Sequence, residues 1–149
     1  MKHANKPEEA AVVFKEGFNC SQAVFSVIAP RFGLDREIAA RTASAFGGGM
    51  ARRGEVCGAV TGAIMAIGLA RGGGRPDRKN EKDAAYAAAR EFMRRFEERN
   101  GSVLCRELLG CRLDTPEGYE RARSEGLFDT LCPRLVRDAV EIFEELPST

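Results

Sequence analysis

The sequence predicts an all-α fold of about seven to eight helices. Apolar residues recur at helical spacing along most of the chain, and glycines and prolines separate these stretches. No segment alternates apolar and polar residues over enough length to predict a strand. The chain has 149 residues, 44% of them hydrophobic and 30% charged, which is typical of one globular domain. We therefore expect a single helical domain over residues 1–149, with residues 1–6 as a flexible tail.

The first part of the chain predicts three helices. A proline and two glutamates open the first, which covers about residues 7–15. Asn19 is a good N-cap for a second helix over about 20–29. Asp35 plays the same part for a third helix over 36–46, which ends at a glycine triplet.

The middle of the chain predicts two longer helices. The fourth covers about residues 55–71, and a second glycine triplet ends it. The fifth covers about 79–100, with alanines and phenylalanines on one face and arginines and glutamates on the other. This pattern indicates an amphipathic helix with one solvated face. The connection over 72–80 is the candidate flexible loop.

Three further helices are expected in the last third. A short one runs from a Ser102 cap through residue 109, where glycine follows. The next covers about 116–125, because Thr115 is a good cap and Pro116 suits the first helical position. The last covers about 131–146 and places its apolar residues toward the core.

Charge and histidine content exclude several classes of function. Lys and Arg number 23 against 22 Asp and Glu, a net charge of +1, so we expect no nucleic-acid partner. His3, in the tail, is the one histidine. Catalytic Ser–His–Asp or Cys–His devices and zinc sites with several histidines are therefore poorly supported. With histidine-based sites poorly supported, we expect any chemistry of this protein to use its five cysteines.

The expected compartment narrows what these cysteines do. The N-terminus has no apolar signal segment. The longest apolar stretch, residues 57–70, is too short to span a membrane. We expect a cytoplasmic protein, in which structural disulfides are rare. Catalytic, metal-binding or redox-active cysteines are then favoured, and small buried hydrophobes are the alternative.

Four cysteines fall at the starts of four expected helices. They are Cys20, Cys57, Cys105 and Cys132. The partial positive charge and free N–H groups of a helix N-terminus favour thiolate and lower the pKa of a cysteine there. Thiolate is the form that binds metals and attacks disulfides or peroxides. Cys111 differs, because it lies in a connection.

The spacings leave the type of site open. They are Cys-x36-Cys-x47-Cys-x26-Cys, with no Cys-x-x-Cys, so a thioredoxin-like dithiol and a zinc ribbon are poorly supported. Four converging helix starts could hold an iron–sulfur cluster or zinc. Two of the four could instead form a reversible disulfide.

Glycines around Cys57 suggest close packing. Gly58 and Gly62 lie four residues apart and share a helix face with neighbouring alanines, which lets another helix approach closely. Such an approach could bring a second thiol near Cys57.

The segment just upstream, residues 47–54, holds three glycines followed by Arg52 and Arg53. It could wrap an anion such as phosphate, but it lacks the Lys-Ser/Thr ending of a P-loop. The alternatives are that one arginine adds positive potential near Cys57 or that both face solvent.

These segments together resemble the redox-active protein family named for its cysteine pattern, C-GCAxxG-C-C. The matching pieces are Gly17-Phe18-Asn19-Cys20-Ser21-Gln22-Ala23, Cys57-Gly58-Ala59-Val60-Thr61-Gly62-Ala63, Cys105-Arg106-Glu107-Leu108-Leu109-Gly110 and Cys132-Pro133. The second piece reads Cys-Gly-Ala where the family name writes Gly-Cys-Ala. The resemblance covers about residues 8–146. It implies redox activity with no assigned substrate, carried by Cys20, Cys57, Cys105 and Cys132, with Cys111 outside the pattern.

Three functions remain open. The first is electron transfer at a convergent site of these four cysteines, through an iron–sulfur cluster or another metal such as zinc. The second is a metal-free enzyme that exchanges disulfides or reduces peroxides. The third is a non-catalytic helical binding module with structural cysteines. An unidentified redox partner and a homodimer are also expected.

Overall fold

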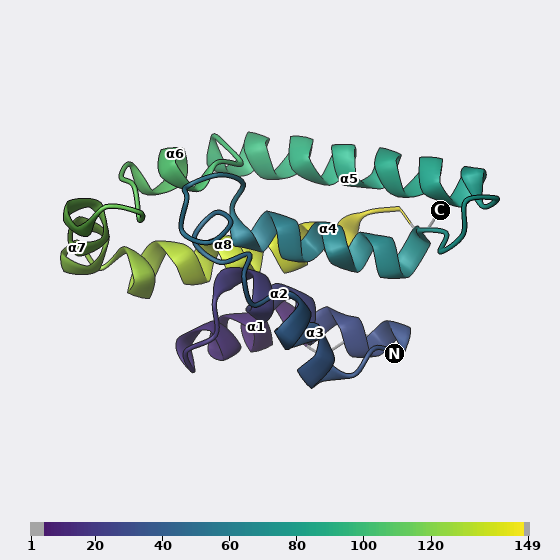
Figure 1. Ribbon diagram of the computed structural model, residues 1–149, viewed down its shortest axis with the longest axis horizontal. Coiled ribbons are helices and arrows are strands. Elements are labelled where there is room, and N and C mark those ends of the chain that lie inside the picture. The colour runs from purple at the N-terminus through teal and green to yellow at the C-terminus, as the bar shows by residue number, and fades with distance from the viewer. Residues whose placement is uncertain (1–4, 148–149) are drawn as a thin grey trace.

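The computed structural model describes residues 5–147, which form eight α-helices and one 3-10 helix (Figure 1). The α-helices are α1 (Lys6–Lys15), α2 (Cys20–Ile28), α3 (Arg36–Thr42), α4 (Gly58–Arg71), α5 (Lys79–Asn100), α6 (Cys105–Leu109), α7 (Pro116–Ser124) and α8 (Leu127–Glu145), and the 3-10 helix is η1 (Ala29–Phe32). Over this stretch there is no strand, only an isolated antiparallel bridge between Val56 and Leu104. The all-α prediction is confirmed.

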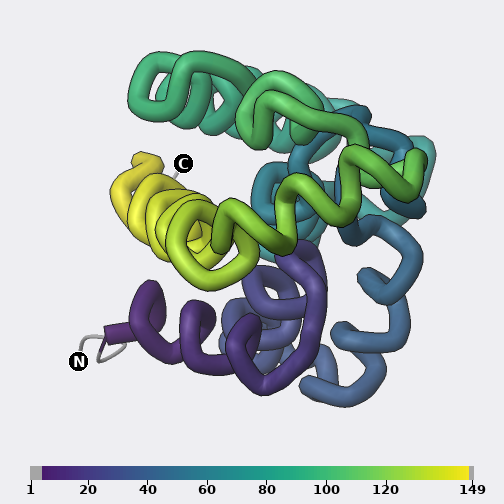
Figure 2. Tube along the Cα trace, turned by 90° about the vertical axis from the view of Figure 1, so that its left-hand side faces the viewer, coloured from purple at the N-terminus to yellow at the C-terminus, as the bar shows by residue number. Residues whose placement is uncertain are grey.

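The helices lie in three tiers. α4 and α8 form the middle tier, α5 lies on one side of them, and α1, α2 and α3 lie on the other (Figures 1 and 2). α6 and α7 sit together at one end, beside the start of α4 (Figure 1). α2 packs against both α4 and α8.

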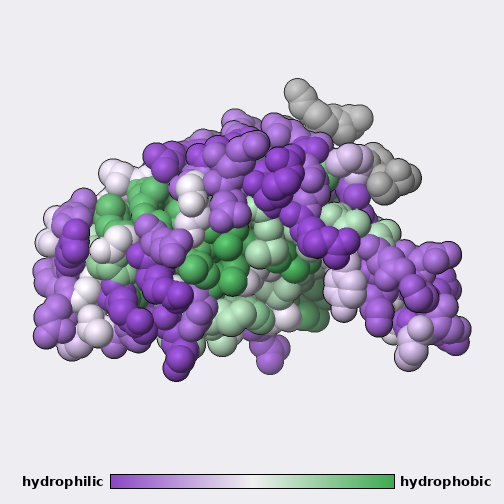
Figure 3. All heavy atoms as spheres, turned by 90° about the horizontal axis from the view of Figure 1, so that it is seen from above, coloured by the Kyte–Doolittle hydropathy of each residue, from purple (hydrophilic) through white to green (hydrophobic). Residues whose placement is uncertain are grey.

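The surface reflects the amphipathic helices. α5 buries Ala88, Phe92 and Phe96 and carries its arginines and glutamates outward, as its sequence predicts. On the face shown in Figure 3, hydrophilic residues surround a central area of apolar ones. Of the helices described, none combines the length and hydropathy that a bilayer crossing requires. The single domain, the flexible 72–80 loop, the homodimer and the cytoplasmic location stay predictions.

Several predicted boundaries hold because local signals set them. α5 begins and ends where the sequence predicts. The side chains of Asn19, Asp35 and Thr115 accept hydrogen bonds from backbone N–H groups three residues on, as N-caps do.

Other boundaries were wrong. The third helix ends at Thr42 rather than near residue 46. The fourth begins at Gly58 rather than near 55, because the residues before it pair with another segment. The short helix begins at Cys105, three residues after Ser102, whose hydroxyl accepts a hydrogen bond from the Leu104 N–H instead. Of the expected tail 1–6, residues 1–4 lie outside the described part, and Lys6 already belongs to α1.

The last helix also starts earlier than predicted. It begins at Leu127 rather than 131, directly after Gly126, whose φ of 73° separates it from α7. Pro133 is therefore the seventh residue of the helix. Proline at this position removes one backbone hydrogen bond, and the buried face of α8 compensates for that loss.

Candidate functional site

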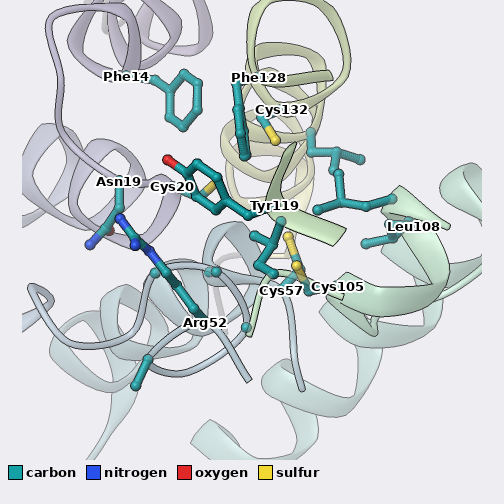
Figure 4. Close-up of a pocket in the computed structure, with 18 of the residues that line it drawn as sticks. Phe14, Asn19, Cys20, Arg52, Cys57, Cys105, Leu108, Tyr119, Phe128 and Cys132 are labelled. Carbon is teal, nitrogen blue, oxygen red and sulfur yellow. The ribbon is translucent and has the colours of Figure 1, made fainter. Parts of the chain in front are cut away.

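The four cysteines of the predicted set line one cavity of about 400 Å³ (Figure 4). Cys20 comes from α2, Cys57 and Cys105 from the starts of α4 and α6, and Cys132 from α8. Three of them are almost fully enclosed, at 3%, 7% and 5% exposed for Cys57, Cys105 and Cys132. The structure thus brings together the four residues that the sequence singled out. Cys111 packs nearby but does not line the cavity.

A capping box fixes Cys20 at the first position of α2. Asn19 accepts a hydrogen bond from the Gln22 N–H at 2.9 Å, and Gln22 accepts one from the Asn19 N–H at 3.0 Å. The Asn19 amide also donates to the Ser44 carbonyl oxygen. The start of α2 is therefore tied to the segment that leads into the glycine-rich loop.

A short antiparallel pairing positions Cys57 and Cys105. The Cys57 N–H donates to the Val103 carbonyl at 2.8 Å, and the Cys105 N–H donates to the Glu55 carbonyl at 2.7 Å. These bonds flank the bridge between Val56 and Leu104. Because side chains alternate along extended chain, both cysteines point to the face opposite that bridge, toward the cavity. Neither thiol position depends on a helix cap alone.

Cys132 lies in the second turn of α8 and not at the start of a helix. It is the sixth residue of α8, so the prediction that it lies in a first turn was wrong. Its side chain lines the cavity and packs with Cys105 and Leu109 in one apolar cluster. Leu135, one turn on, also lines the cavity.

Close approach of α4 to α2 brings Cys20 and Cys57 to the same cavity. A Cβ on Gly58 would lie 3.0 Å from the Ser21 nitrogen and 3.1 Å from the Cys20 Cβ. A Cβ on Gly62 would lie 2.8 Å from the Ser21 carbonyl oxygen. The Gly62 contact is shorter than a side chain allows, and the Gly58 contacts are tighter than most Cβ contacts, so the close packing that the glycine spacing predicts is confirmed.

The glycine-rich loop closes another side of the cavity through its backbone. Gly48, Gly49, Met50, Ala51 and Arg52 all have φ between 54° and 73°, a left-handed turn of five residues. The N–H groups from residue 50 to 55 all donate to carbonyl oxygens within the segment from residue 45 to 50. The interpretation as a phosphate cradle was therefore wrong, because these donors are already used.

Aromatic residues that the sequence analysis did not single out form the mouth of the cavity. The Arg52 guanidinium lies over the Tyr119 ring, 5.0 Å from its centroid. Tyr119 in turn packs against Phe128, with ring centroids 5.4 Å apart. Figure 4 shows this group beside the cysteines. Nothing in the spacing of α7 residues signals this role, because Tyr119 meets Arg52 only in the folded chain.

Burial governs the acidity of the two deep thiols. It raises the pKa of Cys57 to about 11, although the backbone N–H groups of Ala59 and Val60 act in the opposite direction. It raises the pKa of Cys105 to about 12, and the nearby Cys57 and Cys132 add to the effect. The prediction that helix starts lower the pKa of these cysteines was wrong, because loss of hydration outweighs the helix dipole.

Cys20 and Cys132 form an unequal pair. A hydrogen bond from the Cys20 thiol lowers the pKa of Cys132 below its usual value. The same bond, followed by burial, raises the pKa of Cys20 well above its usual value. The contact therefore favours the thiolate of Cys132 over the thiolate of Cys20. This is the arrangement of an attacking thiol beside a thiol that reacts second.

The fit of a metal can be judged from the side-chain arrangement. Across residues 5–147, no three Cys, His, Asp or Glu side chains are grouped so that they could hold a metal ion. The four thiols as placed do not fit an iron–sulfur cluster or zinc, which require three or four ligands at short distance.

Comparison with known proteins gives one match. The family model described as "Putative redox-active protein (C_GCAxxG_C_C)" matches residues 18–146. No curated protein and no solved structure matches. The matched range includes all four cavity cysteines and both cavity-facing glycine segments.

Proposed function

This chain belongs to the redox-active protein family of the C-GCAxxG-C-C pattern, and from that premise we propose that Cys20 and Cys132 form a reversible dithiol–disulfide pair. The pair would reduce a disulfide substrate without a metal. The observation that carries the proposal is that the two thiols line one cavity, where their interaction shifts their pKa values in opposite directions. Both side chains line a cavity that a small substrate can enter.

The exchange uses two electrons and two protons. Cys132, after losing its proton, attacks one sulfur of the substrate disulfide; a protein–substrate disulfide forms, and the first substrate thiolate leaves and takes up a proton. Cys20 then loses its proton and attacks the Cys132 sulfur, which expels the second substrate thiolate, also to be protonated. The net change converts two protein thiols and one disulfide into one protein disulfide and two small thiols. A cellular thiol would reverse it, which fits the expected but unidentified redox partner.

Cys57 and Cys105 take a different part in this proposal. Their raised pKa values keep them protonated near neutral pH, and their thiols line the inner wall. They do not react in the first exchange.

Limited oxidation with peptide mapping tests the assignment. The reduced protein is treated with less than one equivalent of 4,4′-dithiodipyridine, the remaining thiols are blocked in acid, and linked peptides are identified by mass. We expect a link between Cys20 and Cys132, absent in Cys132→Ser. Cys111→Ser is the matched control, because it makes the same chemical change outside the cavity, and it should give the wild-type link. A first link that involves other cysteines, or unchanged oxidation of Cys132→Ser, overturns the proposal.

Electron transfer through an iron–sulfur centre stays the competing prediction. Metal and sulfide analysis of anaerobically purified protein separates the two. Stoichiometric iron and sulfide, lost in Cys57→Ser, would replace the dithiol proposal with the cluster.

A further inference from the structure

The cavity carries an isolated positive charge at its mouth. Arg52 is the one charged side chain among its lining residues, and no carboxylate lines it. Within residues 5–147, no Asp or Glu lies within ion-pairing distance of the Arg52 guanidinium. The neighbouring Arg53, by contrast, points away from the cavity toward Glu55.

The backbone holds Arg52 in place at some cost. Arg52 ends the left-handed turn, with φ of 65°, and its N–H donates to the Gly47 carbonyl at 3.0 Å. A left-handed backbone costs conformational free energy for a residue other than glycine. It persists only where the surrounding contacts hold the backbone in that conformation. On the other side, the Tyr119 ring supports the guanidinium through a cation–π contact. The backbone turn and the contact with Tyr119 thus both hold the Arg52 guanidinium at the mouth of the cavity.

The remaining wall is largely apolar. Leu108, Leu113 and Phe128 are among the apolar residues that line the cavity together with Arg52 and the thiols. A ligand that uses the whole cavity therefore needs an apolar body and a negative group at one end. A site of this kind fixes orientation through its few polar groups.

We propose that Arg52 selects a small disulfide that carries a carboxylate, and orients it so that a sulfur reaches Cys132. This inference rests on the proposed function, because it assigns the substrate class of the same pair. The redox step is the exchange written above, with the anionic disulfide as oxidant. Arg52 is a specificity-determining residue and takes no part in bond making.

Two probe disulfides of different charge test this selection. The reagent 5,5′-dithiobis(2-nitrobenzoate) carries two carboxylates, and 4,4′-dithiodipyridine is neutral. Their second-order rate constants are measured at one pH in a Cys111→Ser background, which removes the thiol outside the cavity. We expect Arg52→Gln to lower the ratio of anionic to neutral rate by about fivefold, the effect of one charge near the protein surface.

Matched variants make the test specific. Arg53→Gln removes the same charge one residue away and should leave the ratio unchanged. Arg52→Lys keeps the charge and should retain most of the ratio. Added salt should slow the anionic probe in Arg53→Gln but much less in Arg52→Gln.

The outcomes separate this inference from the proposed function. If Arg52→Gln keeps the wild-type ratio, or Arg53→Gln lowers it equally, the selection by Arg52 is wrong while the Cys20–Cys132 link stands. If Cys132→Ser reacts with both probes as the wild type does, the dithiol pair itself is wrong.

Discussion

Cys132 owes its acidity to one neighbour. The hydrogen bond from Cys20 is the largest influence on its pKa and lowers it, while burial opposes the effect. Cys57 receives hydrogen bonds from the backbone N–H groups of Ala59 and Val60, but burial outweighs them and raises its pKa, and burial also dominates at Cys105. The acidity of each thiol in this cavity is therefore set by the balance between burial and hydrogen bonds, not by its position at a helix start.

Removing that donor should slow Cys132. In Cys20→Ala, the pKa of Cys132 should rise toward or above its usual value, because burial then acts unopposed. Near neutral pH we expect about tenfold slower alkylation of Cys132 by iodoacetamide, the ratio given by one pKa unit. The measurement is the labelling rate as a function of pH, read by peptide mass.

Cys20→Ser is the control for this change. Its hydroxyl keeps a donor in the same place, so the midpoint of labelling should stay below that of Cys20→Ala. Equal midpoints in the two variants would show that the hydrogen bond does not set the pKa of Cys132. In the wild type, the labelling rate should fall as pH drops through the lowered pKa, because protonation removes the thiolate.

At the level of elements, local signals were predictable and long-range pairing was not. Asn19 and Thr115 cap helices through neighbours three residues away, so sequence alone identifies them. The extended segment before α4 depends on Val103 and Leu104, almost fifty residues later, and no local pattern reveals it. The place of Pro133 is also decided by long-range packing, because the buried face of α8 makes a proline inside the helix tolerable.

The contact between α2 and α4 offers a test at this scale. Gly62→Ala places a Cβ 2.8 Å from the Ser21 carbonyl oxygen and 3.2 Å from the Val24 Cβ. The helices must then separate, and we expect the free energy of unfolding to fall by about 1–3 kcal/mol, as in other overpacked cores. Denaturant unfolding measures it.

The matched control lies in the same helix. A Cβ on Gly68 meets nothing within 4 Å, so Gly68→Ala should raise the free energy of unfolding by roughly 0.5–1 kcal/mol through helix propensity. Destabilisation of similar size by both variants would mean that close packing is not the reason for Gly62.

For the whole molecule, the fold explains why widely spaced cysteines can act together. The bundle places parts of α2, α4, α6 and α8 around one cavity. The sequence singled out these four cysteines through the expected helix starts and the family pattern, and it offered their convergence as a hypothesis. The helix-start argument was right for the other three but wrong for Cys132, which lies further inside α8. Their unequal pKa values could not be predicted, since burial and the contact between Cys20 and Cys132 exist only in the folded chain.

Oxidation of the pair should stabilise the whole fold. A disulfide between Cys20 and Cys132 closes a loop of about 110 residues. Loop entropy predicts that such a bond raises the free energy of unfolding by roughly 4–5 kcal/mol, and disulfides typically contribute about 2–4 kcal/mol. We expect the oxidised protein to unfold at higher denaturant than the reduced protein. Cys132→Ser should abolish the difference and Cys111→Ser should retain it. Equal stability of the oxidised and reduced wild type would contradict a bond joining α2 to α8.

The central claim is that this cavity stores two electrons in a metal-free thiol pair. Native mass spectrometry of anaerobically purified protein, before and after one equivalent of 4,4′-dithiodipyridine, tests it most directly. We expect the mass of the polypeptide alone, followed by a loss of about 2 Da as two thiols become one disulfide. A mass that includes iron and sulfide, or the absence of that loss in protein that retains its free thiols, would contradict it.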